Sequence, residues 1–169
     1  MKRIALIATL ILVSATPAFA HAGHGIASGF LHPFLGWDHL IAMLAVGAWG
    51  ATLGVRAMWA VPAAFVSAMI VGGLFGMSGI EVPFVETMIL ASVLALAGFA
   101  VARVKMPIWS GMAIVGLFAL AHGFAHGTEM PALSSAWIYG AGFVAATSLI
   151  HLLGAIAALA VMRMKTVRV

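Results

Sequence analysis

Two short segments carry side chains that could bind a transition metal. The segment AHGFAHGTEMP, residues 121–131, contains His122, His126 and Glu129. On a helix, a rotation of about 100° per residue places these three side chains within roughly 40° of one another on one face. Imidazole nitrogens and a carboxylate oxygen suit nickel, cobalt, copper or zinc better than magnesium or calcium. This segment is therefore a candidate binding site for a divalent transition metal.

The second segment is HPFLGWDH, residues 32–39. His32 and His39 are seven residues apart and share a face if a helix begins near Pro33, a residue suited to a first helical turn. Asp38 is turned about 100° from His39. It could be a ligand beside His39, or it could accept a hydrogen bond from an imidazole on a neighbouring helix, as carboxylates near metal-bound histidines often do.

Three further histidines are weaker candidates for metal ligands. His151 stands alone in the last apolar segment, where it could be a deeper ligand or form a hydrogen bond between helices. His21 and His24 lie in the segment HAGHG, which could chelate a metal or be a mobile polar tail. A lone histidine in a helix is usually a packing residue. The two segments together hold four histidines and two acids, and such a gathering indicates a function because ionisable groups within a membrane are costly.

The composition is that of an integral membrane protein. Of the 169 residues 64% are hydrophobic and only 7% are charged, and the mean hydropathy is +1.20. Soluble domains have about 25% charged residues. The net charge of +4 does not indicate nucleic-acid binding, because the basic residues stand singly or in small groups between apolar runs. The absence of cysteine excludes disulfides, thiolate metal sites and cysteine nucleophiles.

The elements that position these residues are apolar segments. Residues 1–20 are typical of a signal peptide: Lys2 and Arg3, an apolar stretch and the small-residue end Ala18-Phe19-Ala20. Cleavage there leaves residues 21–169 as a single transmembrane helical domain. The sequence predicts an all-α bundle with five spans in the mature chain and six hydrophobic segments in the precursor. The predicted spans are 30–53, 58–77, 84–102, 108–127 and 135–162.

The charges predict an orientation in the cytoplasmic membrane. With the mature N-terminus outside and the C-terminus in the cytoplasm, every basic residue of the mature chain lies on the cytoplasmic side, as the positive-inside rule requires. These residues are Arg56, Arg103, Lys105, Arg163, Lys165 and Arg168. The outer connections then hold Glu81, Glu86 and Glu129, and both histidine segments lie near the outer ends of their spans.

Glycine pairs four residues apart predict close contacts between helix backbones. In lipid, small residues favour helix association because they let backbones approach. The pairs are Gly50 and Gly54, Gly72 and Gly76, and Gly123 and Gly127. They indicate a compact bundle.

At its two histidine segments the sequence resembles the HupE/UreJ family of small nickel permeases, which are associated with nickel-dependent hydrogenase and urease systems. The resemblance covers the mature chain, with a His-x5-Asp-His pattern at His32, Asp38 and His39. A His-Gly-x-Ala-His-Gly-x-Glu pattern follows from His122 to Glu129. The resemblance implies nickel as the ion, with cobalt as a substitute. Family members are often described with six spans, whereas five are expected here after cleavage.

We therefore expect a secondary transporter that takes up Ni²⁺ without hydrolysing ATP, since the chain has no glycine-rich phosphate loop. His39, His122 and His126 are the first-choice ligands. The expected partners are the ion and the lipid bilayer, with no nucleic acid and no resident cofactor, and self-association into a homo-oligomer is left open. The alternatives are a metal-binding delivery or sensor subunit and a membrane metalloenzyme; the His-Glu-x-x-His pattern of zinc hydrolases is absent from the sequence.

Overall fold

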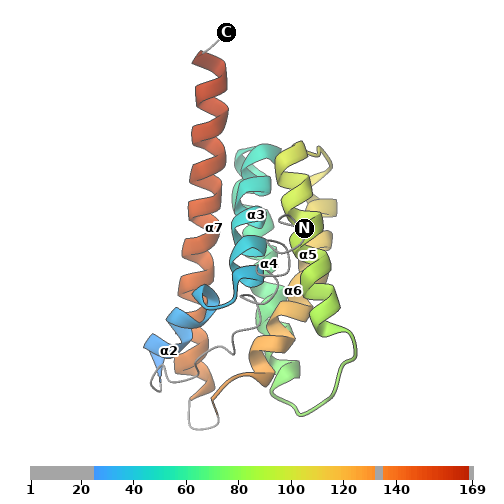
Figure 1. Cartoon of the computed structure of the whole chain (residues 1–169), viewed down its shortest axis with the longest axis vertical. Helices are drawn as coiled ribbons and strands as arrows, with labels where there is room; N and C mark the ends of the chain where they lie inside the picture. Colours follow the sequence, from blue (N-terminus) through green and yellow to red (C-terminus); the bar gives the residue numbers. More distant parts are fainter. Residues whose placement is uncertain (1–24, 132–134, 168–169) are drawn as a thin grey trace, which may run out of the picture.

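The computed structural model describes residues 25–131 and 135–167, and within them the chain is helical, without strands. This confirms the predicted all-α class. The predicted signal peptide and the candidate ligands His21 and His24 lie outside the described residues. The helices follow one another as α2 (Ile26–Leu31), the 3₁₀ turn η1 (His32–Phe34), α3 (Trp37–Leu53), α4 (Val55–Gly76), α5 (Val85–Ala102), α6 (Ile108–Thr128) and α7 (Ala136–Val167) (Figure 1).

Four helices, α4 to α7, are each long and apolar enough to cross a membrane. Within the described residues a fifth span exists only if α2, η1 and α3 are counted together as one bent unit. The predicted last span, 135–162, is longer than the other predicted spans, and the structure has it as one continuous helix. α7 extends past the ends of its neighbours on its C-terminal side (Figure 1).

The predicted first span, 30–53, is not one continuous helix. The segments Ile26–Phe34 and Trp37–Leu53 meet at an angle of 84°. Gly36 precedes α3 with an extended backbone (φ −96°, ψ 111°), which interrupts the helical hydrogen bonding. The prediction that His32 and His39 share one helical face is therefore wrong, because they lie on different sides of this break.

α4 and α6 are held together through glycine, as the sequence predicted for two of the three pairs. A Cβ atom on Gly72 would collide with the backbone carbonyl of Leu120, and one on Gly123 with that of Met69. Gly76 and Gly127 have equivalent backbone contacts across the same interface. The glycines of the 122–129 segment thus face α4 and allow its backbone to approach.

The two glycines of the third pair have different roles. A Cβ atom on Gly50 would lie 3.1 Å from the backbone carbonyl oxygen of Ala57 in α4, so this glycine has the predicted close backbone contact. Gly54 has no neighbour within 4 Å of an added Cβ and adopts φ 120° in the sharp connection between α3 and α4. This left-handed region favours glycine because it has no side chain to clash. Gly54 therefore permits a turn and does not pack two helices together.

α7 packs against α2 and α3 through other close glycine contacts. Gly47 of α3 lies against the backbone carbonyl of His151, and Gly154 of α7 lies against that of Leu44. Gly29 of α2 similarly meets the carbonyl of Tyr139. These contacts bring the face of α7 that carries Tyr139 and His151 against the N-terminal half of the chain.

Candidate metal-binding site

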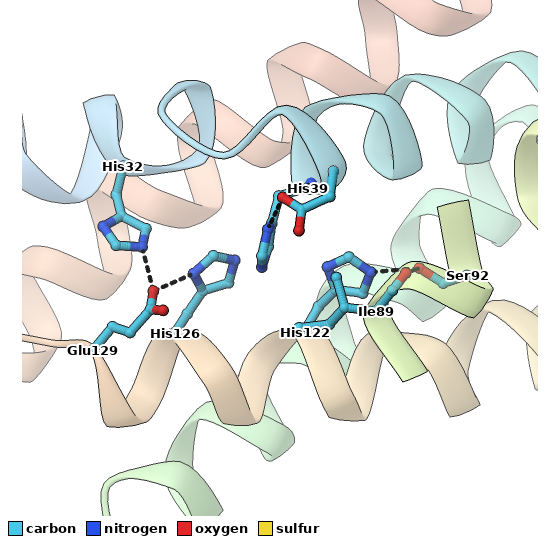
Figure 2. Close-up of polar contacts among 8 residues, drawn as sticks. His32, His39, Ile89, Ser92, His122, His126 and Glu129 are labelled. Carbon is cyan, nitrogen blue, oxygen red and sulfur yellow. Dashed lines mark hydrogen bonds and ion pairs between the residues drawn. The ribbon is translucent and has the colours of Figure 1, made fainter. Parts of the chain in front are cut away.

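The structure brings the two histidine segments together inside the bundle. His39 in the first turn of α3 faces His122 and His126 in the last two turns of α6 (Figure 2). All three side chains are buried, and their candidate ligand nitrogens lie within 4.8 Å of one another. The ring centroids are 4.8 Å apart for His39 and His122 and 4.3 Å apart for His39 and His126. We call these three residues the buried histidine cluster.

The spacing of the cluster is close to that of a metal-bound set. Bonds from zinc to imidazole nitrogen are about 2.0–2.1 Å long, so two nitrogens on one such ion lie at most about 4.2 Å apart. Small side-chain rotations would bring any pair of nitrogens near the 4.8 Å limit within this distance. The arrangement provides three nitrogen ligands from two helices, which leaves further coordination positions for water or carboxylate.

A second group of ligands lies next to the cluster and nearer the surface. It consists of His32, His126 and Glu129, whose ligand atoms are also within 4.8 Å of one another. The Nε2 of His32 is 3.1 Å from Oε2 of Glu129, and Nδ1 of His126 is 3.9 Å from the same oxygen. We call this set the outer group. His126 belongs to both sets, so the two form one continuous row of ligands.

Asp38 contacts the histidine that follows it in the sequence. Its Oδ1 accepts hydrogen bonds from the ring Nδ1 and the backbone N–H of His39, both at 2.8 Å. The hydrogen bond predicted for Asp38 was to an imidazole on a neighbouring helix, whereas the observed one is to the next residue of its own helix. A role of Asp38 as a ligand stays a prediction. Because the ionised carboxylate only accepts, Nδ1 of His39 carries the proton and Nε2 keeps its lone pair.

Ser92 of α5 was missed by the sequence reasoning. Its Oγ lies 2.7 Å from Nε2 of His122, and the serine is fully buried (Figure 2). A serine in an apolar span is typical of helix packing, and no spacing rule connects it with a histidine thirty residues further along. Only the packing of α5 against α6 reveals the contact.

Four nitrogen atoms in the buried histidine cluster have no hydrogen-bond partner within the described structure: Nε2 of His39, Nδ1 of His122 and both ring nitrogens of His126. Leaving a buried polar atom unpaired costs about 1–3 kcal/mol. Such atoms in native proteins require an explanation, and a bound ion or water is a common one. The donor set therefore fits a divalent cation.

The family model described as "HupE / UreJ protein" matches residues 8–169. The chain belongs to the HupE/UreJ family. The chain is also similar to "Protein HupE" of Rhizobium leguminosarum bv. viciae, with 45% identity over 153 residues that cover 88% of this chain and 80% of the relative. No solved structure matches the chain.

In this HupE/UreJ protein, His151 lies outside both ligand sets. It is 2% exposed, and neither ring nitrogen has a hydrogen-bond partner in the part of the chain that the structure describes. Its ring packs edge-on against Phe65 at 5.1 Å, and Phe65 packs against His122 at 5.6 Å. The alternative role predicted for His151, a hydrogen bond between helices, is therefore not seen. Thr147, one turn earlier on α7, also has a buried hydroxyl without a partner.

A cavity of about 360 Å³ lies between α4, α6 and α7 and reaches His126. Apart from His126 and Tyr139, the side chains that line it are apolar, among them Ile70, Leu74 and Phe143. A hydrated divalent cation is poorly stabilised by such walls. The outer group, with a carboxylate that is 52% exposed, is the better polar approach to the cluster.

Proposed function

We propose that this multi-pass membrane protein takes up Ni²⁺, with Co²⁺ as a substitute, across the cytoplasmic membrane. The observation that carries the proposal is the buried histidine cluster, in which three imidazoles from two helices converge and four ring nitrogens lack a hydrogen-bond partner among the described residues. These ligands alone suit several divalent transition metals. The resemblance of the motifs to nickel permeases favours nickel among them.

The distribution of charge supports inward transport. Arg56 lies in the first turn of α4, Arg103 and Lys105 lie in the α5–α6 connection, and Arg163 lies near the C-terminal end of α7. The N-terminal end of α4, the α5–α6 connection and the C-terminal end of α7 are at the same end of the bundle (Figure 1). The α4–α5 and α6–α7 connections lie at the opposite end (Figure 1). By the positive-inside rule the basic end is cytoplasmic, so the outer group faces the outside.

The two ligand sets form a route for the ion, and His126 belongs to both of them. An ion that enters from outside first meets Glu129 and His32 and then reaches the buried histidine cluster through His126, which belongs to both sets. His151, beyond the ring of Phe65, is the next imidazole on the cytoplasmic side. Binding has to be favourable enough to remove part of the hydration shell and weak enough for release, which a mixed shell of imidazole and water provides.

The membrane potential is sufficient to drive uptake. A potential of 100 mV, negative inside, contributes about 2.3 kcal/mol per charge and thus about 4.6 kcal/mol for a divalent ion. The sequence has no glycine-rich phosphate loop for ATP. We therefore propose a secondary transporter, with the delivery subunit as the alternative that binds nickel without moving it.

The test is nickel flux into sealed vesicles that contain the purified protein alone. We expect radioactive nickel to accumulate under an inside-negative potential and His126→Ala to abolish this accumulation. Glu81→Gln is the matched control, since it removes an exposed carboxylate from the α4–α5 connection and should leave flux unchanged. Nickel that binds without entering the vesicles would favour the delivery role instead.

A further inference from the structure

The contact between Ser92 and His122 joins a third helix to the buried histidine cluster. α5 carries none of the histidines or acids of the two motifs. Its Ser92 nevertheless points toward the ring of His122 in the buried histidine cluster (Figure 2). The serine is fully buried, and its Oγ also lies 2.6 Å from the backbone carbonyl oxygen of Ile89. Two partners therefore compete for one hydroxyl proton.

The protons can be assigned from these two contacts. The carbonyl of Ile89 can only accept, and a helical serine commonly donates to the carbonyl three or four residues earlier. When the hydroxyl of Ser92 donates to the carbonyl of Ile89, its oxygen can only accept from His122. Nε2 of His122 therefore carries a proton and donates it to Oγ. A neutral imidazole has one proton, so Nδ1 is left with its lone pair.

The opposite assignment is less favourable. If Ser92 donated to Nε2, the proton of His122 would be on Nδ1, where the structure provides no acceptor. The carbonyl of Ile89 would also lose its contact with the hydroxyl. A buried N–H without an acceptor is rarer in proteins than an acceptor without a donor.

We propose that Ser92 is a positioning residue that holds His122 in the tautomer whose Nδ1 lone pair is available to the ion. This inference rests on the proposed binding of a divalent metal by the cluster. Asp38 has the equivalent effect on His39, so two ligands are fixed by two different partners, a hydroxyl from α5 and a carboxylate from α3. Such partners of metal-bound histidines typically change affinity by about 10–100-fold when removed.

The decisive variant is Ser92→Ala, which removes the hydroxyl without adding volume. Ser28→Ala is its matched control, because Ser28 is also a buried helical serine that donates to a carbonyl three residues earlier, with no contact to a histidine of the described residues. Ser92→Thr keeps the hydroxyl. We expect Ser92→Ala to weaken nickel binding by about tenfold or more in detergent, Ser28→Ala to have no effect, and Ser92→Thr to restore most of the affinity.

A second measurement reads the tautomer directly. Nitrogen NMR of ¹⁵N-histidine protein without metal, at about pH 8 and so above the reference imidazole pKa of about 6.5, distinguishes protonated from unprotonated ring nitrogens. We expect His122 to carry its proton on Nε2 in the wild type and in Ser28→Ala. In Ser92→Ala we expect a mixture of tautomers.

The two readouts separate this inference from the proposed function. Unchanged nickel affinity in Ser92→Ala, or a wild-type proton on Nδ1 of His122, would overturn the role of Ser92 even if the protein transports nickel. A wild type with the expected tautomer that binds no nickel would overturn the metal site on which the inference rests. Equal losses of affinity in Ser92→Ala and Ser28→Ala would show a structural effect and reject the inference.

Discussion

At the scale of single residues, the candidate ligands could be predicted from sequence but their protonation could not. Spacing placed His122, His126 and Glu129 on one face, and the cost of polar groups in a membrane marked them as functional. The hydrogen bond from His39 to Asp38 and that between His122 and Ser92 depend on side-chain rotamers and on the packing of α5. These features decide which ring nitrogen keeps a lone pair for the proposed ion.

The first residue-scale prediction concerns Asp38. Asp38→Asn keeps an oxygen that can accept from Nδ1 of His39 but removes the negative charge, whereas Asp38→Ala removes both. We expect nickel affinity to fall by about tenfold in Asp38→Asn and further in Asp38→Ala, within the range found for partners of metal-bound histidines. Calorimetric titration with nickel in detergent checks the order, and equal effects of the two variants would contradict it.

The second concerns protons as competitors for the ligands. Neutral imidazole binds the metal, and the protonated form does not. Lowering the external pH from about 7.5 to about 5 crosses the reference histidine pKa of about 6.5, so the fraction of neutral ligand falls. We expect uptake at constant membrane potential to decrease over this interval. Uptake that is unchanged or faster at the lower pH would contradict imidazole as the capturing ligand.

At the scale of helices, the apolar segments were predicted well and the local geometry near the site was not. Hydropathy identified the segments that became α4 to α7, because the length of a span is set by the bilayer. The break at Gly36 escaped prediction because glycine and proline near an apolar run are compatible with a helix start as well as with a bend. The break is important for the site, since it separates His32 in η1 from His39 in α3.

The helix-scale prediction concerns the glycines between the ligands. Gly123 follows His122 and lies against the backbone of α4, so an added methyl group would separate the two helices. We expect Gly123→Ala to destabilise the protein by about 1–3 kcal/mol, as overpacking does elsewhere, and to weaken nickel binding. Gly98→Ala in α5 is the control, because nothing lies within 4 Å of its added Cβ. Thermal unfolding in detergent measures both, and equal melting temperatures would contradict the packing role.

At the scale of the whole molecule, the charges at the two ends of the bundle and the position of the ligand sets within it indicate the same orientation in the membrane. The sequence predicted the segregation of basic and acidic residues at opposite ends. Glu129 of the outer group follows the C-terminal end of α6, which lies at the same end of the bundle as the α4–α5 connection (Figure 1). The position of His151 relative to the cluster could not be predicted, because it depends on how α7 packs against α3 and α4. The ring of Phe65 contacts both His122 and His151 and separates His151 from the buried histidine cluster.

The whole-molecule prediction separates binding from passage. His151→Leu replaces a buried imidazole by an apolar side chain of similar size and leaves the buried histidine cluster intact. We expect equilibrium nickel binding within about twofold of the wild type but flux about tenfold lower, as loss of about 1.4 kcal/mol of stabilisation along the route would give. Flux into vesicles and binding in detergent are measured on the same preparation. Wild-type flux in this variant would show that His151 only packs.

The central claim is that imidazoles of α3 and α6 bind one and the same ion, and X-ray absorption of the nickel-loaded protein tests it most directly. The account predicts a shell of about three imidazole nitrogens completed by oxygen, consistent with the three histidines of the cluster. It predicts the loss of one imidazole in His39→Ala and of one in His122→Ala. A nickel shell with the wild-type number of imidazoles in either variant would contradict it.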